Sequence, residues 1–347
     1  KNGHLYKVNN FDFHRYEDTI KLADDPDYNQ ANFEGMLEIK GDADHTKLIE
    51  MLDALNDESQ KIDNVLDTYF DTENLVYWLA FQILTGNCDT QNRNCYLYSP
   101  LNSNTWYFLD WDNDGMLRKL ELSLTGFSDY ASWERGASNY WGNALFNRAL
   151  RSKSFRSELD RAVKDLRSYL TEERLAKMIK HYREVTESLV FASPDIDNLP
   201  VTKDQYEQIV AAIPSEIEEN YKSFRESFKK PMPFYIGVPQ IDNGKLRINW
   251  DASYDFEARD IRYTVELARD YAISDVVFKA EDVLLPEVTC DAPDAGQYFA
   301  RVRATNSDGY TQDAFDYYVT DDGKQYGMKC FYVQDDGKVV EDTYEEG

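Results

Sequence analysis

The stretch that decides the fold spans residues 87–114 and reads Asn87-Cys-Asp-Thr-Gln-Asn-Arg-Asn-Cys-Tyr-Leu-Tyr98, then a turn, then Trp106-Tyr-Phe-Leu-Asp-Trp-Asp-Asn-Asp114. It places Asp89 five residues before Asn94 and ends in an acidic cluster, Asp110, Asp112 and Asp114. Carboxylates this close repel one another unless a cation or hydrogen-bond donors compensate them. The cluster therefore favours a cation site over a solvated turn.

A helix is predicted directly before Asp89. Over residues 71–85, apolar side chains recur at helical spacing on a stripe formed by Leu75, Leu79 and Ile83. Asp71 or Thr72 can cap its start, and Gly86-Asn87 is a stop signal. Asp89 is thus expected on a loop held by a buried helix, where catalytic carboxylates are often found.

A β-hairpin is predicted after Asn94. Residues 95–98 alternate like a strand, residues 100–104 supply the turn, and residues 106–109 return as a second strand. Because the second strand runs back along the first, the acidic cluster at its end is expected near the Asp89 loop.

An Asp, an Asn five residues later and an Asp after a short hairpin form the acidic half of a kinase active site. In that arrangement the first Asp orients the attacking hydroxyl, and the Asn and second Asp hold magnesium on the phosphates. Magnesium usually takes only one or two protein carboxylates beside phosphate and water, so Asp112 with Asn94 suffices.

The wider pattern resembles the spore coat protein H (CotH) kinase-like family of atypical, secreted or surface-associated bacterial proteins. The segments that carry the resemblance are residues 3–7, 70–79, 84–89, 94–98 and 108–114, and their order and spacing match across about the first two-thirds of the chain. The resemblance implies ATP, Mg²⁺ or Mn²⁺ and a protein hydroxyl acceptor. It makes Asp89 the catalytic acid and Asn94, Asp112 and Asp114 the metal-binding residues. Lys7 is a candidate phosphate contact, or equally a structural lysine.

The resemblance also implies an α+β fold over residues 1–230, an atypical protein-kinase-like fold consisting mostly of the helical C-terminal lobe. Lys1 aligns with the middle of the family pattern, so most of the N-terminal lobe is expected to be missing, as in a fragment or a processed product. Helical periodicity predicts helices within residues 42–60, 145–150, 155–170, 171–191 and 204–228.

A second interpretation competes for the acidic cluster. Residues 110–121 fit the EF-hand calcium-loop pattern completely, with Asp110, Asp112, Asp114 and Glu121 as the ligands. The flanks oppose a true EF-hand, because a hairpin precedes the pattern and residues 120–124 alternate like a strand. A non-catalytic surface, spore-coat or cellulosome-associated scaffold with structural calcium therefore stays open beside the kinase interpretation, and so does the question of whether the chain is an enzyme.

A second domain is predicted after the hinge at residues 229–233. Short alternating runs at 246–250, 262–267, 276–278 and 297–304 indicate an all-β sandwich over residues 231–322, similar to a fibronectin type III module. Trp250 and Tyr298 are expected in its core, Tyr298 as a tyrosine corner. Residues 323–347 form a tail with one further hairpin, between residues 326–333 and 338–343.

Composition narrows the choice of partners. The formal net charge of −26 makes duplex DNA and anionic membrane surfaces poor partners. No apolar run is long enough to span a membrane. The resemblance and the second domain suggest a secreted or surface location on a bacterial cell. Cys88 with Cys95, and Cys290 with Cys330, can each be a disulfide or two reduced thiols.

Overall fold

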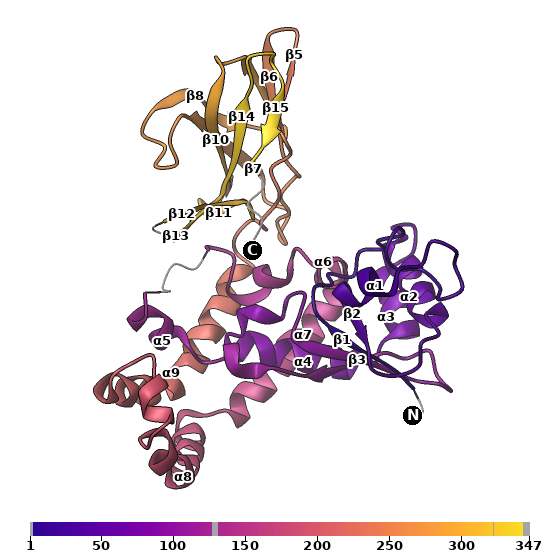
Figure 1. Cartoon of the computed structure of the whole chain (residues 1–347), viewed down its shortest axis with the longest axis vertical. Coiled ribbons are helices and arrows are strands. Elements are labelled where there is room, and N and C mark those ends of the chain that lie inside the picture. The colour runs from indigo at the N-terminus through magenta and orange to yellow at the C-terminus, as the bar shows by residue number, and fades with distance from the viewer. Residues whose placement is uncertain (1–2, 127–130, 322, 343–347) are drawn as a thin grey trace. The chain divides into compact units, whose positions relative to one another are not determined.

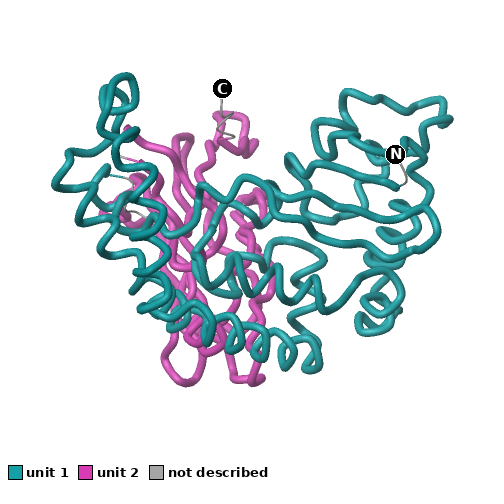
Figure 2. Tube along the Cα trace, turned by 90° about the horizontal axis from the view of Figure 1, so that it is seen from below, with its two compact units in different colours: residues 1–128, 135–224 teal, residues 129–134, 225–347 magenta. Residues whose placement is uncertain are grey.

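The computed structural model describes residues 3–126, 131–321 and 323–342. Its contacts divide the chain into two compact units (Figure 2). Unit 1 comprises residues 1–128 and 135–224, and unit 2 comprises residues 129–134 and 225–347.

Unit 1 contains a four-stranded antiparallel sheet with the strand order β2-β1-β3-β4 (Figure 1). Its strands are β1 (Gly3–Val8), β2 (Leu37–Ile39), β3 (Cys95–Pro100) and β4 (Tyr107–Asp110). The predicted hairpin is confirmed as β3 and β4. Tyr6 lies opposite Leu97, and Leu97 lies opposite Phe108, so the three side chains share one face of the sheet. All three are buried, and this face is therefore the one that packs against the core.

Unit 1 also contains most of the helices. They are α1 (Gln30–Met36), α2 (Thr46–Asn56), α3 (Ile62–Tyr69), α4 (Thr72–Thr85), α5 (Lys119–Leu124), α6 (Ala144–Arg151), α7 (Lys153–Tyr169), α8 (Glu172–Val190) and α9 (Lys203–Ser227), the last of which ends in unit 2. The predicted helices are confirmed, with α2 shorter than the range 42–60. Among the described residues, no helix is both long and apolar enough to cross a membrane.

Helix α4 fixes the hairpin in place. Its N-cap, Asp71, accepts a hydrogen bond from the Asn74 amide at 2.9 Å, and Gly86 ends it in the left-handed conformation at φ 65°. The Asn74 side chain then bonds both backbone groups of Phe108 on β4, at 2.7 Å and 3.1 Å. The helix and the strand that leads to the acidic cluster are therefore held in one register.

The strand expected over residues 120–124 was a wrong prediction, because this segment is the helix α5. Leucines that alternate along a strand also recur at i and i+4 of a helix, so the pattern alone is ambiguous. The helical form is favoured by Glu216 of α9, which is only 4% exposed and accepts hydrogen bonds from the backbone amides of Lys119 and Leu120. The carboxylate thus satisfies amides that a helix start leaves without partners.

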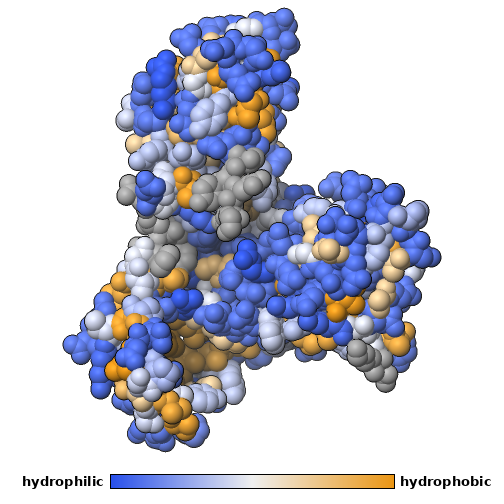
Figure 3. Space-filling view, in the orientation of Figure 1, coloured by the Kyte–Doolittle hydropathy of each residue, from blue (hydrophilic) through white to orange (hydrophobic). Residues whose placement is uncertain are grey.

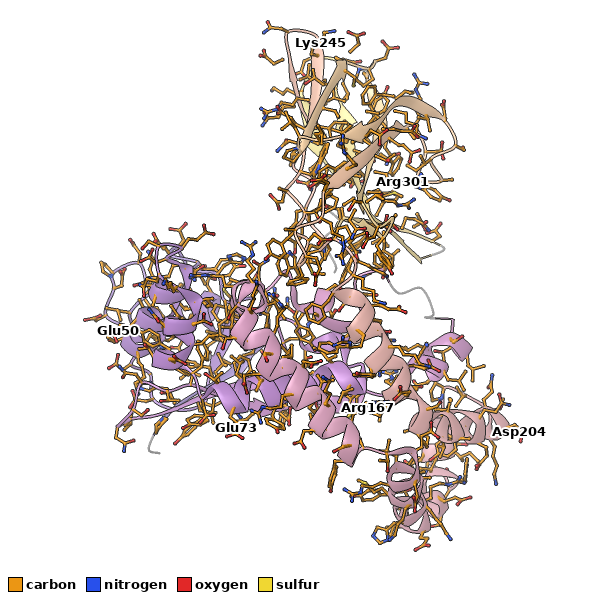
Figure 4. All side chains as sticks on the ribbon, turned by 180° about the vertical axis from the view of Figure 1, so that it is seen from behind. Glu50, Glu73, Arg167, Asp204, Lys245 and Arg301 are labelled. Carbon is orange, nitrogen blue, oxygen red and sulfur yellow. The ribbon has the colours of Figure 1, made fainter. Side chains whose placement is uncertain are left out.

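Ion pairs join the three long helices of unit 1. Arg167 of α7, which is labelled in Figure 4, bonds Glu218 of α9 at 2.7 Å, and Arg183 of α8 bonds Glu207 of α9, also at 2.7 Å. Apolar side chains remain at the surface of the α8 region (Figure 3). On α8 they recur at spacings of three and four residues: Met178, Tyr182, Val185 and Leu189.

Apart from the end of α9, the regular elements in the described residues of unit 2 are β-strands, as predicted. Its strands are β5 (Gln240–Asp242), β6 (Lys245–Asn249), β7 (Ile261–Ala268), β8 (Val276–Val283), β9 (Glu287–Asp291), β10 (Gly296–Asn306), β11 (Thr311–Asp313), β12 (Tyr317–Thr320), β13 (Gly323–Tyr326), β14 (Met328–Val333) and β15 (Val339–Glu341). One sheet has the order β5-β6-β9, and the other has the order β15-β14-β10-β7-β8 with β11 also on β10. The separate pair β12-β13 completes the unit.

The core of unit 2 contains both aromatic residues singled out in its sequence. Trp250 is 4% exposed and Tyr298 is 2% exposed. The Tyr298 hydroxyl donates to the Asp294 carbonyl at 2.9 Å, the backward bond expected of a tyrosine corner. Arg301 of β10 pairs with Glu266 opposite it on β7 (Figure 4). The predicted late hairpin is confirmed as β14 and β15, although its last residue, Thr343, lies outside the described residues.

A buried histidine makes the stability of unit 1 depend on pH. His45 is fully buried against the ring of Phe33, and its two ring nitrogens lie 2.8 Å from the Tyr6 hydroxyl and 3.3 Å from the Tyr28 hydroxyl. Desolvation lowers the pKa of His45 below its ordinary 6.5, and nearby His4 adds to this, whereas Asp44 and Asp42 oppose it.

The free energy of unfolding is therefore expected to fall as the pH drops below 6.5, because the unfolded chain takes up the proton first. Thermal melts between pH about 7.5 and about 5.5 measure this loss. The loss should be smaller in His45→Phe and unchanged in His181→Gln, which alters an exposed histidine. An identical decline in the wild type and His45→Phe would contradict the assignment.

Candidate functional site

The structure brings Asp89 and Asn94 into direct contact. Asp89 lies in the short 3₁₀ helix Cys88–Thr90, directly after the end of α4. Asn94 has a left-handed backbone, φ 59°, which aims its side chain back so that Nδ2 donates to Asp89 Oδ2 at 2.9 Å. Asn and Asp are the side chains that best tolerate this conformation outside glycine.

Asp112 and Asp114 lie close to this pair. Asp112 is also left-handed, at φ 55°, and begins the 3₁₀ turn Asn113–Gly115. A Cβ on Gly115 would lie 2.5 Å from Asn87 Oδ1 and 3.6 Å from the Asp89 Cβ, so the turn approaches the Asp89 loop closely enough to require glycine. The predicted proximity of the acidic cluster to Asp89 thus holds for this part of the cluster.

The electrostatics of Asp89 suit a proton acceptor. Partial desolvation raises its pKa, and the charges of Asp114 and Asp112 raise it further. Arg93, with Nε 3.5 Å from Asp89 Oδ1, and the Asn94 hydrogen bond act in the opposite direction. A carboxylate whose pKa exceeds its ordinary value is a better general base than a free one.

Asp110, the third acid of the cluster, has a different environment. Its Oδ1 accepts a hydrogen bond from Gln82 Nε2 at 2.8 Å, and its pKa is raised by desolvation, against the effect of Gln82. Both oxygens of Glu121 accept bonds from Arg118, at 2.7 Å and 2.9 Å. Two of the four residues of the calcium pattern are therefore engaged with protein partners. Within the described ranges, no three His, Cys, Asp or Glu side chains converge to hold a metal.

Two site residues escaped the sequence analysis. Gln82 is fully buried on α4, and its Oε1 accepts from Asn87 Nδ2 at 3.0 Å while its Nε2 reaches Asp110. Asn87 is 1% exposed, and its Oδ1, beside Gly115 and Asp89, has no hydrogen-bond partner. A lone glutamine within the apolar run Leu-Ala-Phe-Gln-Ile-Leu was the signal that could have identified the first of them.

Replacing Gln82 with alanine is expected to lower the free energy of unfolding by about 1–3 kcal/mol, because the buried Asn87 amide loses its 3.0 Å acceptor and keeps only the longer 3.4 Å bond to Asn113, and Asp110 loses its donor. Chemical denaturation measures the loss. The matched control is Gln60→Ala, which removes a hydrogen bond between exposed groups and should change stability by less than about 0.5 kcal/mol. Equal effects in the two variants would contradict the role of the buried network.

Lys7 belongs to a sheet face beside the acidic cluster. It lies opposite Tyr96 in the β1–β3 register, and Tyr96 lies opposite Leu109 in the β3–β4 register. The Lys7 ammonium lies 5.7 Å from the ring centre of Trp111, which makes an edge-to-face contact with Tyr96 at 5.2 Å. Leu109 is 43% exposed and Trp111 is 44% exposed. This open face, defined by Lys7, Tyr96, Leu109 and Trp111, leads directly to Asp112.

The cysteines beside the site carry thiols in the structure. Cys88 donates to the Gly86 carbonyl, and Cys95 is buried, with its pKa raised by desolvation. Cys290 and Cys330 likewise form no disulfide and lie on strands of different sheets. Of the two states that the sequence left open for each pair, the structure has the reduced one.

Comparisons with known proteins bear on this geometry. The family model described as CotH kinase protein matches residues 1–224. No curated protein sequence matches the chain. Among solved structures, the twitchin kinase region from C. elegans is similar at 19% sequence identity and a TM-score of 0.21, over 27% of this chain and 20% of that one. That likeness is confined to a small part of each chain.

Proposed function

Since the chain belongs to the CotH kinase protein family, we propose that unit 1 transfers phosphate from ATP to a protein hydroxyl in a divalent-metal-dependent reaction. The observation that carries the proposal is the contact between Asp89 and Asn94 beside Asp112 and Asp114. These residues stand in the order and spacing of the acidic half of a kinase site.

Asp89 is the residue we assign to the acceptor hydroxyl. It lies at the surface, where a protein substrate can reach it, and its raised pKa favours taking up the hydroxyl proton as the phosphate is transferred. The bond from Asn94 holds Oδ2 and fixes the carboxylate in one orientation, while Oδ1 lies 3.5 Å from Arg93 Nε.

The oxygen donors beside Asp89 fit magnesium or manganese. Asn94 uses its Nδ2 on Asp89, which leaves its Oδ1 for a cation, and the exposed Asp112 and Asp114 add carboxylates. The unpartnered Oδ1 of Asn87 is a further buried oxygen at the same turn. A bound metal would supply positive charge that offsets the negative charge of the phosphates.

The open face of the sheet is where we place the nucleotide. Tyr96, Leu109 and Trp111 offer aromatic and apolar surface for a base next to Asp112. Lys7 brings positive charge to the same face, which suits phosphate binding. Its ammonium lies over the Trp111 ring, so a phosphate contact requires the side chain to leave that ring.

Melting of the whole chain with different ligands tests the proposal. Mg²⁺ with ATP is expected to raise the melting temperature of unit 1 more than either component alone, because a ligand that binds only the folded state stabilises it. The competing scaffold with structural calcium predicts a rise with Ca²⁺ alone and no effect of nucleotide. That second result would overturn the kinase proposal.

We further propose that unit 2 is a fibronectin type III-like sandwich and that the protein acts at the surface of a bacterial cell or outside it. The strand orders β5-β6-β9 and β14-β10-β7-β8 support the first part, as does the Tyr298 bond to Asp294. A non-catalytic role in a surface assembly is the outcome to which a failed nucleotide test would lead.

A further inference from the structure

A lysine and two carboxylates meet in a largely buried cluster of unit 2. The side chain of Lys329 is 13% exposed, that of Asp316 is 9% exposed and that of Glu341 is 31% exposed. Lys329 Nζ lies 3.0 Å from Asp316 Oδ1 and also contacts Glu341 Oε1. All three residues belong to unit 2, whereas the residues of the proposed kinase site belong to unit 1.

The fold holds each member of the cluster in place. Lys329 lies on β14 opposite Ala300 of β10, and Glu341 lies on β15 opposite Phe331 of β14. Asp316 stands just before β12, and its carbonyl accepts bonds from the amides of Gly327 and Met328 at 2.7 Å and 3.2 Å. The amine and the carboxyl group are thus kept in contact, as a reaction between them requires.

A backbone donor points at the Asp316 carboxyl group. The Ile236 amide donates to Asp316 Oδ2 at 2.7 Å, while the Lys329 amine faces Oδ1. If a nucleophile attacks the carboxyl carbon, negative charge develops on an oxygen that already has this donor. The arrangement therefore supplies both a nucleophile and stabilisation for the charge that its attack creates.

The surroundings of the Asp316 carboxyl group raise its pKa. Two carboxylates share one ammonium away from water, and desolvation raises the pKa of Asp316 in spite of Lys329. Desolvation lowers the pKa of Lys329, but Asp316 and Glu341 outweigh it and raise that pKa, so the amine needs a proton acceptor within reach. Glu341, in contact with Nζ, is that acceptor.

We propose that Lys329 and Asp316 condense into an intramolecular isopeptide bond, with Glu341 as the group that moves the proton. Glu341 takes a proton from the Lys329 ammonium, and the neutral amine attacks Cγ of protonated Asp316. The N–C bond forms, the Ile236 amide stabilises the oxyanion, and Glu341 passes its proton to the leaving hydroxyl and then takes up the extra proton of the new amide nitrogen, so that Glu341 ends protonated. The C–O bond breaks and one water is released, with no oxidant or reductant involved.

The bond would join β14 covalently to the segment before β12. It closes a loop that contains the β12–β13 pair, and a link of this kind restricts the unfolded chain. The chemical class of the site is therefore a self-catalysed structural cross-link, which requires no partner or cofactor and forms during or after folding.

The intact mass of the purified full chain tests the proposal. The wild type is expected to be one water molecule lighter than its sequence mass, whereas Lys329→Arg and Glu341→Gln are expected to show the full mass. Lys338→Arg is the matched control, because Lys338 lies in the turn of the same hairpin, 75% exposed and 3.6 Å from Asp336. It should keep the mass deficit of the wild type.

Trypsin digestion locates the bond in the wild type without relying on any variant. Cleavage after Lys329 should be blocked, and a branched product should join residues 304–324 to residues 325–338. This product separates the cross-link from succinimides at Asp-Gly steps such as residues 336–337, which also lose water. A folded wild type with its full sequence mass after prolonged incubation, or with a deficit that persists in Lys329→Arg, would overturn the proposal.

Discussion

Asp112→Ala is expected to abolish binding of the metal–ATP complex, whereas Asp89→Ala is expected to retain binding and to lose phosphate transfer by roughly 10²–10⁴-fold. The difference follows from the position of each carboxylate. Asp112 borders the open face where we place the nucleotide, and we assign it to the metal together with Asn94 and Asp114. Asp89 is bonded to Asn94 and faces the acceptor, so its loss removes the proton acceptor and not the metal site.

Calorimetry with Mg²⁺ and ATP measures binding, and transfer is followed separately with labelled ATP. Asp67→Asn is the matched control, because it removes one exposed carboxylate from α3, outside the site. It should match the wild type in both assays. Wild-type transfer by both Asp112→Ala and Asp89→Ala would refute the assignment of the site, whatever the family implies.

Phe108→Ala is expected to lower the free energy of unfolding of unit 1 by about 3–5 kcal/mol. Phe108 is 2% exposed on β4, and its ring lies 4.8 Å from Trp78, 5.8 Å from Phe13 and 6.0 Å from Phe146. Removing the ring leaves a cavity where the hairpin, α4 and α6 meet, and this rigid cluster cannot collapse to fill it.

Chemical denaturation followed by helical circular dichroism reports on unit 1, because its helices contribute most of that signal. Tyr182→Ala is the control for losing a large ring at the surface, since Tyr182 is 61% exposed on α8, and its effect should stay within about 0.5 kcal/mol. If Phe108→Ala were no more destabilising than Tyr182→Ala, β4 would not be anchored as described.

Local sequence patterns were sufficient to predict the helix and the two strands nearest the site. Asp71 as a cap and Gly86 as a stop predicted α4, and turn residues between two alternating runs predicted β3 and β4. These signals act over a few residues and do not depend on distant partners. The contact of Asp89 with Asn94 is likewise local, because only five residues separate them in the sequence.

The features that the sequence did not predict depend on contacts between residues that are far apart in the chain. Residues 119–124 form a helix because Glu216, far along the chain on α9, accepts bonds from the first amides. Asp110 was grouped with Asp112 by spacing, yet Gln82 of α4 engages it. The cluster of Lys329, Asp316 and Glu341 likewise depends on strand pairing that no local motif encodes.

Phosphate transfer from γ-labelled ATP is the most direct test of the central claim that unit 1 is a metal-dependent phosphotransferase. The full chain is incubated with Mg²⁺ or Mn²⁺ and candidate protein acceptors, beside Asp112→Ala and the Asp67→Asn control. Our account predicts label on protein with the wild type and the control, and none with Asp112→Ala or after metal chelation. Label that persists in Asp112→Ala, or no label with any form under either metal, would contradict it.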